Sequence, residues 1–372
     1  GHPQHLMKIV QVQTQAEAAG AQRVSDMVGE GLRERGHDVR TVFMYRKTEA
    51  YDHDAFADFV LRERPGGLLG QMKASLGLVR YLRKARPDAV ISYQHYGNIF
   101  GTLGARLAGA RHVVANQSGA PQTRGMMGLL SRIDRLMGMA GAYQSNVVNS
   151  AWTEAQFANY PDAYKRRIRR IDHGVAGPPQ NYDKAAARAA FGLPPGAFLA
   201  LSTGRLSTDK NHIALAATLC DLPDLHVAIA GAGPEGERLL AFARDKGVSG
   251  RLHLVGEVPP ARIFEFLSAG DAYVFPSLNE TFGLAVVEAA IAGLPIVANG
   301  LPVLREVLTG DGGEPAALFV DGTDVKSIVA ALAEIMEQPD LADRLAASGR
   351  GLARRYSPTT MCIGYENLLL TS

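Results

Sequence analysis

Two glutamates, Glu280 and Glu288, are the residues of this chain whose type and spacing most directly suggest chemistry. They lie in NETFGLAVVEAAIAGLPIVA, residues 279–298, where the second glutamate interrupts an apolar run. A carboxylate inside an apolar helix costs free energy unless it is paired or meets a ligand. If the whole segment were helical, the two carboxylates would stand roughly 12 Å apart along its axis. They are too far apart for a close catalytic dyad, so we predict that they contact two parts of one extended ligand.

The start of this helix and an upstream loop could together hold an anion. The helix is expected to begin near Phe282 or Gly283, where free backbone N–H groups and the positive end of the helix dipole would attract negative charge. Upstream, GRLSTDK places Arg205 and Lys210 five positions apart in a loop after the apolar run FLALSTG. Two such cations could hold a diphosphate. The alternative interpretation is a solvated surface pair.

A glycine-rich segment, GAGPEG, satisfies the G-x-G-x-x-G pattern through Gly231 and Gly233, and Glu257 follows at about the spacing of a ribose-binding acid. Dinucleotide-binding domains usually carry this pattern in their first βα turn. Here it lies in a later unit and contains Pro234. We therefore favour a tight turn close to a nucleotide over a nicotinamide site.

The elements that must position these residues follow an alternating order. Short apolar runs alternate with helical patterns, such as the one at residues 21–36, which is typical of parallel sheets covered on both faces. Proline and glycine collect at residues 174–196, where we place a domain boundary. We predict an α/β chain of two doubly wound domains, in which ligands bind beyond the carboxyl ends of the strands. The expected strands are MKIVQVQ, DVRTVFMY, DAVISYQH, RHVVANQ and SNVVNS in the first half, and FLALSTG, LHVAIAGAG, RLHLVGE, AYVFPS and PIVANG in the second.

Composition excludes several classes of function. With 39 basic and 37 acidic residues among 372, the chain has no general affinity for nucleic acid. Two cysteines, Cys220 and Cys362, exclude a disulfide framework and a cysteine cluster for zinc or iron–sulfur, and a reducing, cytoplasmic location is expected. No apolar run is long enough to span a bilayer. The first six residues, GHPQHL, are interpreted as a cloning remnant rather than a signal peptide.

The motifs together resemble a known family. Glu280, the following TFG, Glu288, the trailing EAAIAGLPIVA and the upstream GRLSTDK resemble the donor half of glycosyltransferase family 4, the retaining enzymes of GT-B fold. The resemblance extends through most of the chain and is strongest over residues 200–310. It implies two Rossmann-like domains facing across a cleft. The implied divisions are an acceptor-side domain at 7–177, a nucleotide-sugar-binding domain at 178–355 and a helix at 356–372 that returns to the first domain.

In the donor half, the resemblance assigns roles position by position. Arg205 and Lys210 would contact the diphosphate, Glu280 the hydroxyls of the transferred sugar, and Glu288 the ribose. Further donor-side positions are the backbone N–H groups of Phe282, Gly283 and Leu284, Val258 beside the base, and Gly231 and Gly233 in the tight turn.

In the first half, the resemblance implies that Gly20 lets the backbone approach the phosphates and that His95 lies near the reacting sugar. A lone histidine after a strand is otherwise more often structural. Gln22 and Arg23, at the start of the first helix, could contact the acceptor, although an exposed helix start explains them nearly as well. The sequence departs from the family pattern at Gln117, where an acceptor-side histidine is common, at Ala19, where a glycine is common, and at His173, Gly174, Val175 and Ala176, which replace N-G-V-D. These departures leave the acceptor open.

The activity implied by the resemblance is retaining transfer of a sugar from a nucleotide-diphosphate sugar to an acceptor hydroxyl, on a carbohydrate or a lipid-linked acceptor. It would serve cell-surface polysaccharide or glycolipid biosynthesis and use no metal or other cofactor. The segment DHD at residues 52–54 is interpreted as solvated surface. Two alternatives stay open: a nucleotide-sugar epimerase or hydrolase of the same fold, and a non-catalytic two-lobed nucleotide-binding protein.

One helical segment raises the question of peripheral contact with the cytoplasmic face of a membrane. Residues 124–140, RGMMGLLSRIDRLMGMA, have an apolar stripe with two arginines opposite. Core packing is the commoner explanation of such a stripe, but basic amphipathic helices also lie on membranes. YKRRIRR at residues 164–170 adds a cationic patch. The stripe consists of Met126, Met127, Leu130, Ile133 and Met137, and the arginines are Arg132 and Arg135.

Overall fold

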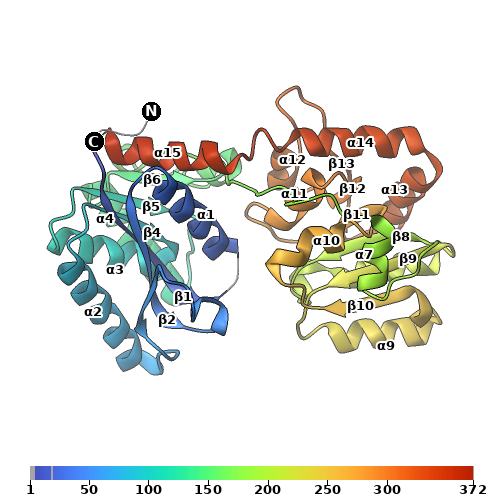
Figure 1. The fold of residues 1–372 in the computed structure, drawn as a ribbon, viewed down its shortest axis with the longest axis horizontal. Coiled ribbons are helices and arrows are strands. Elements are labelled where there is room, and N and C mark those ends of the chain that lie inside the picture. The colour runs from blue at the N-terminus through green and yellow to red at the C-terminus, as the bar shows by residue number, and fades with distance from the viewer. Residues whose placement is uncertain (1–4, 18–19, 372) are drawn as a thin grey trace. The chain divides into compact units, whose positions relative to one another are not determined.

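The computed structural model describes residues 5–17 and 20–371, so Ala19 lies outside the described residues. The chain divides into two units, Gly1–Gly174 with Tyr356–Ser372, and Val175–Arg355. The first boundary therefore follows Gly174, whereas the sequence analysis placed it after residue 177. Each unit is an open parallel sheet with helices on both faces (Figure 1).

The sheet of the first unit has seven parallel strands in the order β3-β2-β1-β4-β5-β6-β7. The order reverses between β1 and β4, which makes their carboxyl ends the switch point where open sheets bind ligands. The prediction omitted β3 and β7. The strands are β1 (Lys8–Ala16), β2 (Asp38–Arg46), β3 (Ala57–Leu61), β4 (Ala89–Tyr93), β5 (His112–Asn116), β6 (Ser145–Val148) and β7 (Ile168–Arg170).

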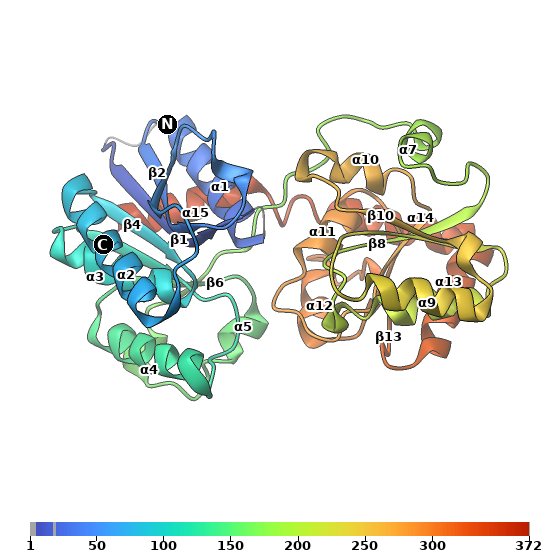
Figure 2. The ribbon, with the colours of Figure 1, turned by 90° about the horizontal axis from the view of Figure 1, so that it is seen from below.

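Two layers of helices cover this sheet. Helix α2 packs against α3 and α3 against α4, so the three form one layer, while α1 packs against α15 (Figure 2). A core of apolar residues such as Val12, Leu78 and Val113 lies between the sheet and the layer of α2 and α3. The helices are α1 (Gly20–Glu34), α2 (Gly67–Ala85), α3 (Gln94–Leu107), α4 (Gly125–Ala140), α5 (Ala151–Ala155), α6 (Asp162–Lys165) and α15 (Pro358–Leu370), with a 3₁₀ turn, η1 (Glu49–Tyr51).

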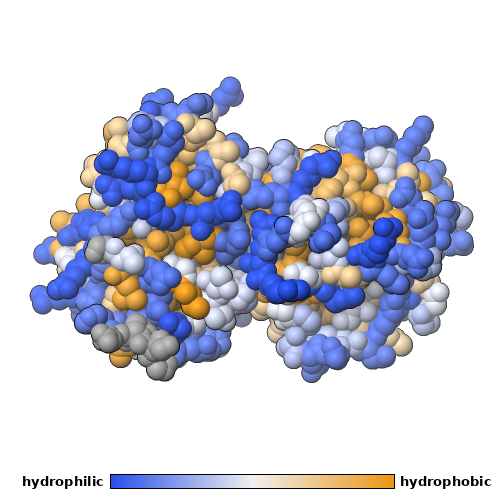
Figure 3. All heavy atoms as spheres, turned by 90° about the horizontal axis from the view of Figure 1, so that it is seen from above, coloured by the Kyte–Doolittle hydropathy of each residue, from blue (hydrophilic) through white to orange (hydrophobic). Residues whose placement is uncertain are grey.

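The apolar side chains of the stripe predicted for α4 differ in burial. Leu130 is buried, Ile133 and Met137 are half-buried, and Met126 and Met127 are exposed. Apolar side chains reach the surface elsewhere too, among hydrophilic ones (Figure 3). Packing in the core therefore explains only part of the stripe.

Helix α15 belongs to the first unit and is anchored there by polar contacts. Glu366 is buried and accepts hydrogen bonds from Arg35 and His37, at 2.9 and 2.8 Å. The His37 Nδ1 accepts the Met7 N–H, so its Nε2 carries the proton donated to Glu366. Burial alone would raise the pKa of Glu366, but these two donors outweigh it and the net pKa is lowered. The Tyr365 hydroxyl donates to the Asn116 side chain at 2.6 Å.

The sheet of the second unit has six parallel strands in the order β10-β9-β8-β11-β12-β13. It has the same doubly wound arrangement, with the switch between β8 and β11. The prediction omitted β13. The strands are β8 (Phe198–Thr203), β9 (Leu225–Ala230), β10 (Leu252–Gly256), β11 (Ala272–Phe275), β12 (Ile296–Asn299) and β13 (Ala317–Val320).

Helices cover both faces of this sheet, around a core that includes Leu215, Val227, Leu239 and Leu332. The helices are α7 (Lys184–Ala190), α8 (His212–Ala217), α9 (Gly236–Lys246), α10 (Ile263–Leu267), α11 (Leu284–Ile291), α12 (Pro302–Val307), α13 (Val325–Glu337) and α14 (Pro339–Gly351). The 3₁₀ turns are η2 (Thr208–Lys210), η3 (Thr218–Cys220), η4 (Ser249–Arg251) and η5 (Pro260–Arg262).

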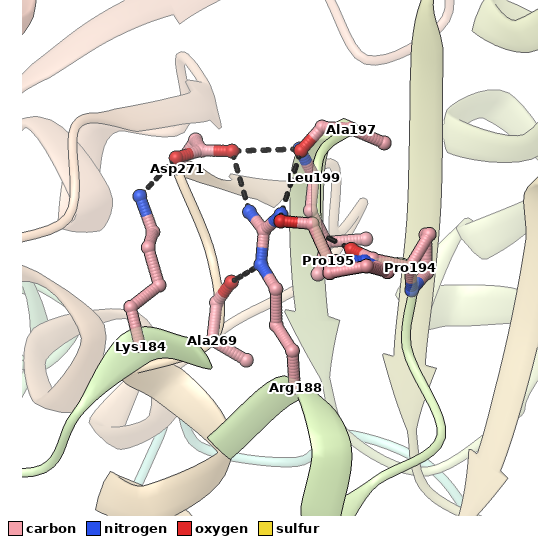
Figure 4. Close-up of polar contacts among 8 residues, drawn as sticks. All are labelled: Lys184, Arg188, Pro194, Pro195, Ala197, Leu199, Ala269 and Asp271. Atoms are coloured by element: carbon pink, nitrogen blue, oxygen red, sulfur yellow. Dashed lines mark hydrogen bonds and ion pairs between the residues drawn. The ribbon is translucent and has the colours of Figure 1, made fainter. Parts of the chain in front are cut away.

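A buried arginine fastens α7 to the amino ends of β8 and β11 (Figure 4). Arg188 is 3% exposed and pairs with Asp271 at 2.8 Å. Asp271 also accepts the Leu199 N–H and contacts Lys184. The guanidinium donates in addition to the carbonyl oxygens of Ala269, Pro194, Pro195 and Ala197.

Candidate active site

The loops that follow β8 and β9 interlock at the carboxyl edge of the second sheet. Gly204 N–H donates to the Ala230 carbonyl and Leu206 N–H to the Ala232 carbonyl, each at 3.0 Å. Gly231 and Gly233 have φ angles of 150° and 156°, which favour glycine. A Cβ on Gly231 would lie 1.9 Å from the Gly204 carbonyl oxygen. Gly231 and Gly233 are thus required for two backbones to meet, which accounts for the first two glycines of the pattern without a dinucleotide.

An ion pair at the same edge joins two residues that the sequence analysis assigned to different parts of the donor. Lys210 Nζ lies 2.7 Å from Glu280 Oε1, and the Ser277 hydroxyl donates to that same oxygen at 2.8 Å. The Lys210 side chain lies beside Gly204, and its Nζ lies 6.0 Å from the centre of the Phe275 ring. The side chains of Lys210 and Glu280 are 25% and 10% exposed, so both charges keep access to solvent or ligand.

Helix α11 begins beside this pair. Gly283 immediately precedes it with a φ of 91°, and a Cβ there would come within 2.9 Å of Leu304. No side chain caps the helix start in the described structure, so the N–H groups of its first turn, beginning at Leu284, are available to an anion. Phe282, the preceding residue, is buried.

The remaining charged positions of this edge differ in burial. The Arg205 side chain is exposed and has no hydrogen-bond or ion-pair partner within residues 5–17 and 20–371. Glu288 is 4% exposed on α11. The pKa of Tyr273 is raised by burial first, and then by the nearby charges of Glu288 and Glu280. Its hydroxyl lies 2.6 Å from Thr203 Oγ1, which joins the ends of β8 and β11.

Val258 follows the edge strand β10 and is half-buried. It lines a cavity of about 540 Å³ together with Phe191, His253 and Arg262. The Arg262 guanidinium lies 4.7 Å from the centre of the Phe191 ring. This cavity runs along β10, and its Val258 end adjoins the carboxyl edge.

In the first unit, Gly20 is the first residue of α1. Gln22 is buried and donates to the Gln15 carbonyl at 2.8 Å, so it joins α1 to the end of β1. Arg23 is half-buried and engaged in an interaction. Acceptor contact by Gln22 and Arg23 stays a prediction.

A buried carboxyl group contacts Gln117 and lies close to His95, and sequence analysis missed it. Asp134 on α4 is 2% exposed and accepts hydrogen bonds from Gln117 Nε2 at 3.1 Å, from Tyr143 at 2.8 Å and from Tyr164 at 2.7 Å. Burial lowers the pKa of His95, and the charge of Asp134 partly opposes this shift. A single acid within the apolar pattern of residues 124–140 was the available signal.

The segment DHD is engaged in local contacts. Asp52 forms an ion pair with Arg46 at 2.6 Å, and Asp54 accepts the Phe56 N–H. Among the described residues, no three His, Cys, Asp or Glu side chains come close enough together to hold a metal ion.

Comparison with known families decides the relationship. The model for glycosyl transferases group 1 matches residues 183–352, and the glycosyl transferase 4-like domain matches residues 19–171. The chain belongs to glycosyltransferase family 4. The two matches divide this glycosyltransferase as its two parallel sheets do.

Curated relatives resemble parts of the glycosyltransferase. D-inositol 3-phosphate glycosyltransferase of Mycobacterium sp. (strain KMS) is 37% identical over 153 residues, 38% of this chain and 33% of the relative. The lipopolysaccharide core biosynthesis glycosyltransferase LpsD of Rhizobium meliloti is 31% identical over 183 residues, 49% of this chain and 52% of the relative. The chain thus spans a third to a half of these relatives.

A solved structure shows the fold. Anabaena HepE, determined in complex with UDP and glucose, superposes with a TM-score of 0.82 at 16% identity and covers 98% of this chain and 100% of its own. The glycosyltransferase therefore has the GT-B fold that the sequence predicted.

Proposed function

We propose that the protein transfers a hexosyl group from a nucleotide-diphosphate sugar to an acceptor hydroxyl, with retention of configuration. The observation that carries this proposal is the meeting of Lys210, Glu280 and the uncapped start of α11 at the carboxyl edge of the second sheet. The exposed Arg205 belongs to the same loop as Lys210. Open parallel sheets bind ligands at this edge.

The donor's diphosphate is the group that this site would hold. Arg205 offers a planar fork for two oxygens, Lys210 a point charge, and α11 its free N–H groups. As the bond from the sugar C1 to the phosphate oxygen breaks, these groups stabilise the charge that develops on the leaving diphosphate. The acceptor oxygen forms its bond to C1 on the same face, and its proton passes to a phosphate oxygen. The chain's own cations supply the charge, so we propose that no metal is needed.

The two glutamates would hold the remaining parts of the donor. Glu280 would meet hydroxyls of the transferred sugar while it keeps Lys210 in place, and Glu288 would hold the ribose. Val258 would lie beside the base, and Gly20 and His95 near the phosphates and the reacting sugar. The acceptor would be a carbohydrate or a lipid-linked molecule of cell-surface glycoconjugate biosynthesis in the cytoplasm. The complex of HepE with UDP and the names of the curated relatives support this choice.

A ligand panel followed by product analysis tests the proposal. Nucleoside diphosphates and their sugars, beginning with UDP and UDP-glucose, should raise the melting temperature, because a ligand that binds only the folded state stabilises it. An α-linked donor should give an α-glycoside, and NMR coupling constants of the product report this configuration. Activity should survive EDTA. An inverted product would contradict retention, and rescue by a divalent metal would contradict the metal-free site. If no glycoside forms, release of free sugar would favour a hydrolase and formation of an epimer would favour an epimerase. Binding of the donor without any turnover would favour a non-catalytic binding protein.

Titration calorimetry separates the roles of the two glutamates. Glu288→Ala should weaken UDP and UDP-glucose alike, by about 1.5–3 kcal/mol, as expected for hydrogen bonds to a charged group. Glu280→Ala should weaken only UDP-glucose. It should leave UDP binding unchanged or tighter, because Lys210 would lose its partner and keep its charge for the diphosphate. Glu237→Ala, on the exposed start of α9, serves as the control. Equal losses for both ligands in Glu280→Ala would contradict this division.

A further inference from the structure

The outer faces of α2, α3 and α4 carry an exceptional share of exposed apolar side chains. They hold ten of the sixteen large apolar side chains that are exposed in residues 5–17 and 20–371. Leu69 is 81% exposed and Leu136 is 66% exposed. The ten are Leu68, Leu69, Met72 and Leu76 on α2, Leu103 and Leu107 on α3, and Met126, Met127, Leu129 and Leu136 on α4.

Helical geometry places these side chains on the outside of the layer. On α2, Ala74, Leu78 and Leu82 face the core. Leu69, Met72 and Leu76 recur at three- and four-residue steps on the opposite side of the same helix. Because α2 packs against α3 and α3 against α4, the exposed side chains of the three helices belong to one outer layer (Figure 2).

The exposed charged side chains of this layer are all positive. Its three helices contain a single acidic residue, Asp134, which is buried. The chain as a whole has 39 basic and 37 acidic residues, and α9, α13 and α14 of the second unit carry both signs. A merely solvated face would share that mixture. The exposed cations of the layer are Lys73, Arg80, Arg83, Lys84, Arg106, Arg132 and Arg135.

We propose that this layer docks the protein onto the surface of an anionic phospholipid bilayer. The leucine and methionine side chains would enter the boundary between head groups and acyl chains, and the flanking arginines and lysines would meet lipid phosphates. The helices would lie in the plane of the surface, as basic amphipathic helices do. No helix among the described residues is long and apolar enough to cross a bilayer. The inference is independent of the donor site, because it rests on a different set of residues.

Vesicle sedimentation tests this proposal without any donor or acceptor. The full chain should bind vesicles of phosphatidylcholine mixed with phosphatidylglycerol and bind vesicles of phosphatidylcholine alone much more weakly. Raising the salt concentration from 0.1 to 1 M shortens the Debye length from about 10 to about 3 Å, so binding should weaken. Absence of binding to the anionic vesicles at low salt would overturn the proposal.

Variants separate the apolar and the cationic contributions. Leu69→Gln combined with Met72→Gln and Leu76→Gln should lower the vesicle partition coefficient by at least about tenfold, because three apolar side chains no longer enter the bilayer. Arg80→Gln with Arg83→Gln should lower it about fivefold per charge. All five side chains are exposed, so melting temperatures should stay unchanged.

The control is Leu240→Gln, an exposed leucine on α9 of the second unit, which should bind vesicles as the wild type does. An equal loss in this control would overturn the assignment to the layer. Analytical ultracentrifugation tests whether a second copy of the chain, rather than a bilayer, covers this layer. A dimer that the α2 variant converts to a monomer would overturn the membrane assignment.

Discussion

Replacing Lys210 with alanine should lower kcat/KM for glycosyl transfer by about a hundredfold or more, as loss of a group that stabilises transition-state charge commonly does. Lys210 contributes one of the two side-chain cations proposed to face the leaving diphosphate. The structure adds a second cost, because the Glu280 carboxylate 2.7 Å away would lose its partner and repel the diphosphate. Arg205→Ala should therefore cost less than Lys210→Ala, since Arg205 has no such partner among the described residues.

A double-mutant cycle isolates this coupling. If unpaired Glu280 adds to the loss, Lys210→Ala combined with Glu280→Gln should lose less activity than the two single losses predict together. Lys246→Ala, an exposed lysine at the end of α9, serves as the control and should keep wild-type activity. A Lys210→Ala enzyme within about threefold of the wild type, with an unchanged melting temperature, would remove Lys210 from the proposed mechanism.

The strands that sequence analysis predicted and those that it missed differ in their place in the sheets. The predicted strands include every interior one, and these are largely buried on both faces, which leaves runs rich in apolar residues. The three missed strands, β3, β7 and β13, all lie at sheet edges. Edge strands meet solvent, so their sequences need not be apolar: β3 is half-buried along its length, and β7 reads Ile-Arg-Arg. Period and hydropathy give little signal for these two strands, whereas β13 reads Ala-Leu-Phe-Val and was missed although its run is apolar.

The candidate site shows a similar division. Residues such as Arg205, Lys210 and Gly283 could be proposed from the sequence because each follows an apolar run or begins a helix, which is local information. The contact between Lys210 and Glu280 was missed because it depends on β8 lying beside β11, and no local pattern specifies that pairing. Asp134 was missed for the same reason, since its partners come from the residue after β5, from the turn after α4 and from α6.

Removal of one buried side chain should destabilise the second unit strongly. Arg188→Ala should lower the free energy of unfolding by about 3–5 kcal/mol, the usual cost of removing one partner of a buried ion pair. Asp271 would be left without its buried cation, and four carbonyl oxygens would lose a donor inside the protein. Arg188→Lys should recover only part of the loss, because an ammonium group lacks the guanidinium's five donors.

The same carboxylate offers a matched control for Arg188. Lys184 also pairs with Asp271, but its side chain is 51% exposed, so Lys184→Ala should cost at most about 1 kcal/mol. Urea unfolding should be followed by a probe in the second unit, because two units need not unfold together. Equal losses for Arg188→Ala and Lys184→Ala would show that burial of the guanidinium does not strengthen this anchor. A large difference would show that the desolvated donors of Arg188, rather than the charge pair as such, hold α7 to the start of β8 and β11.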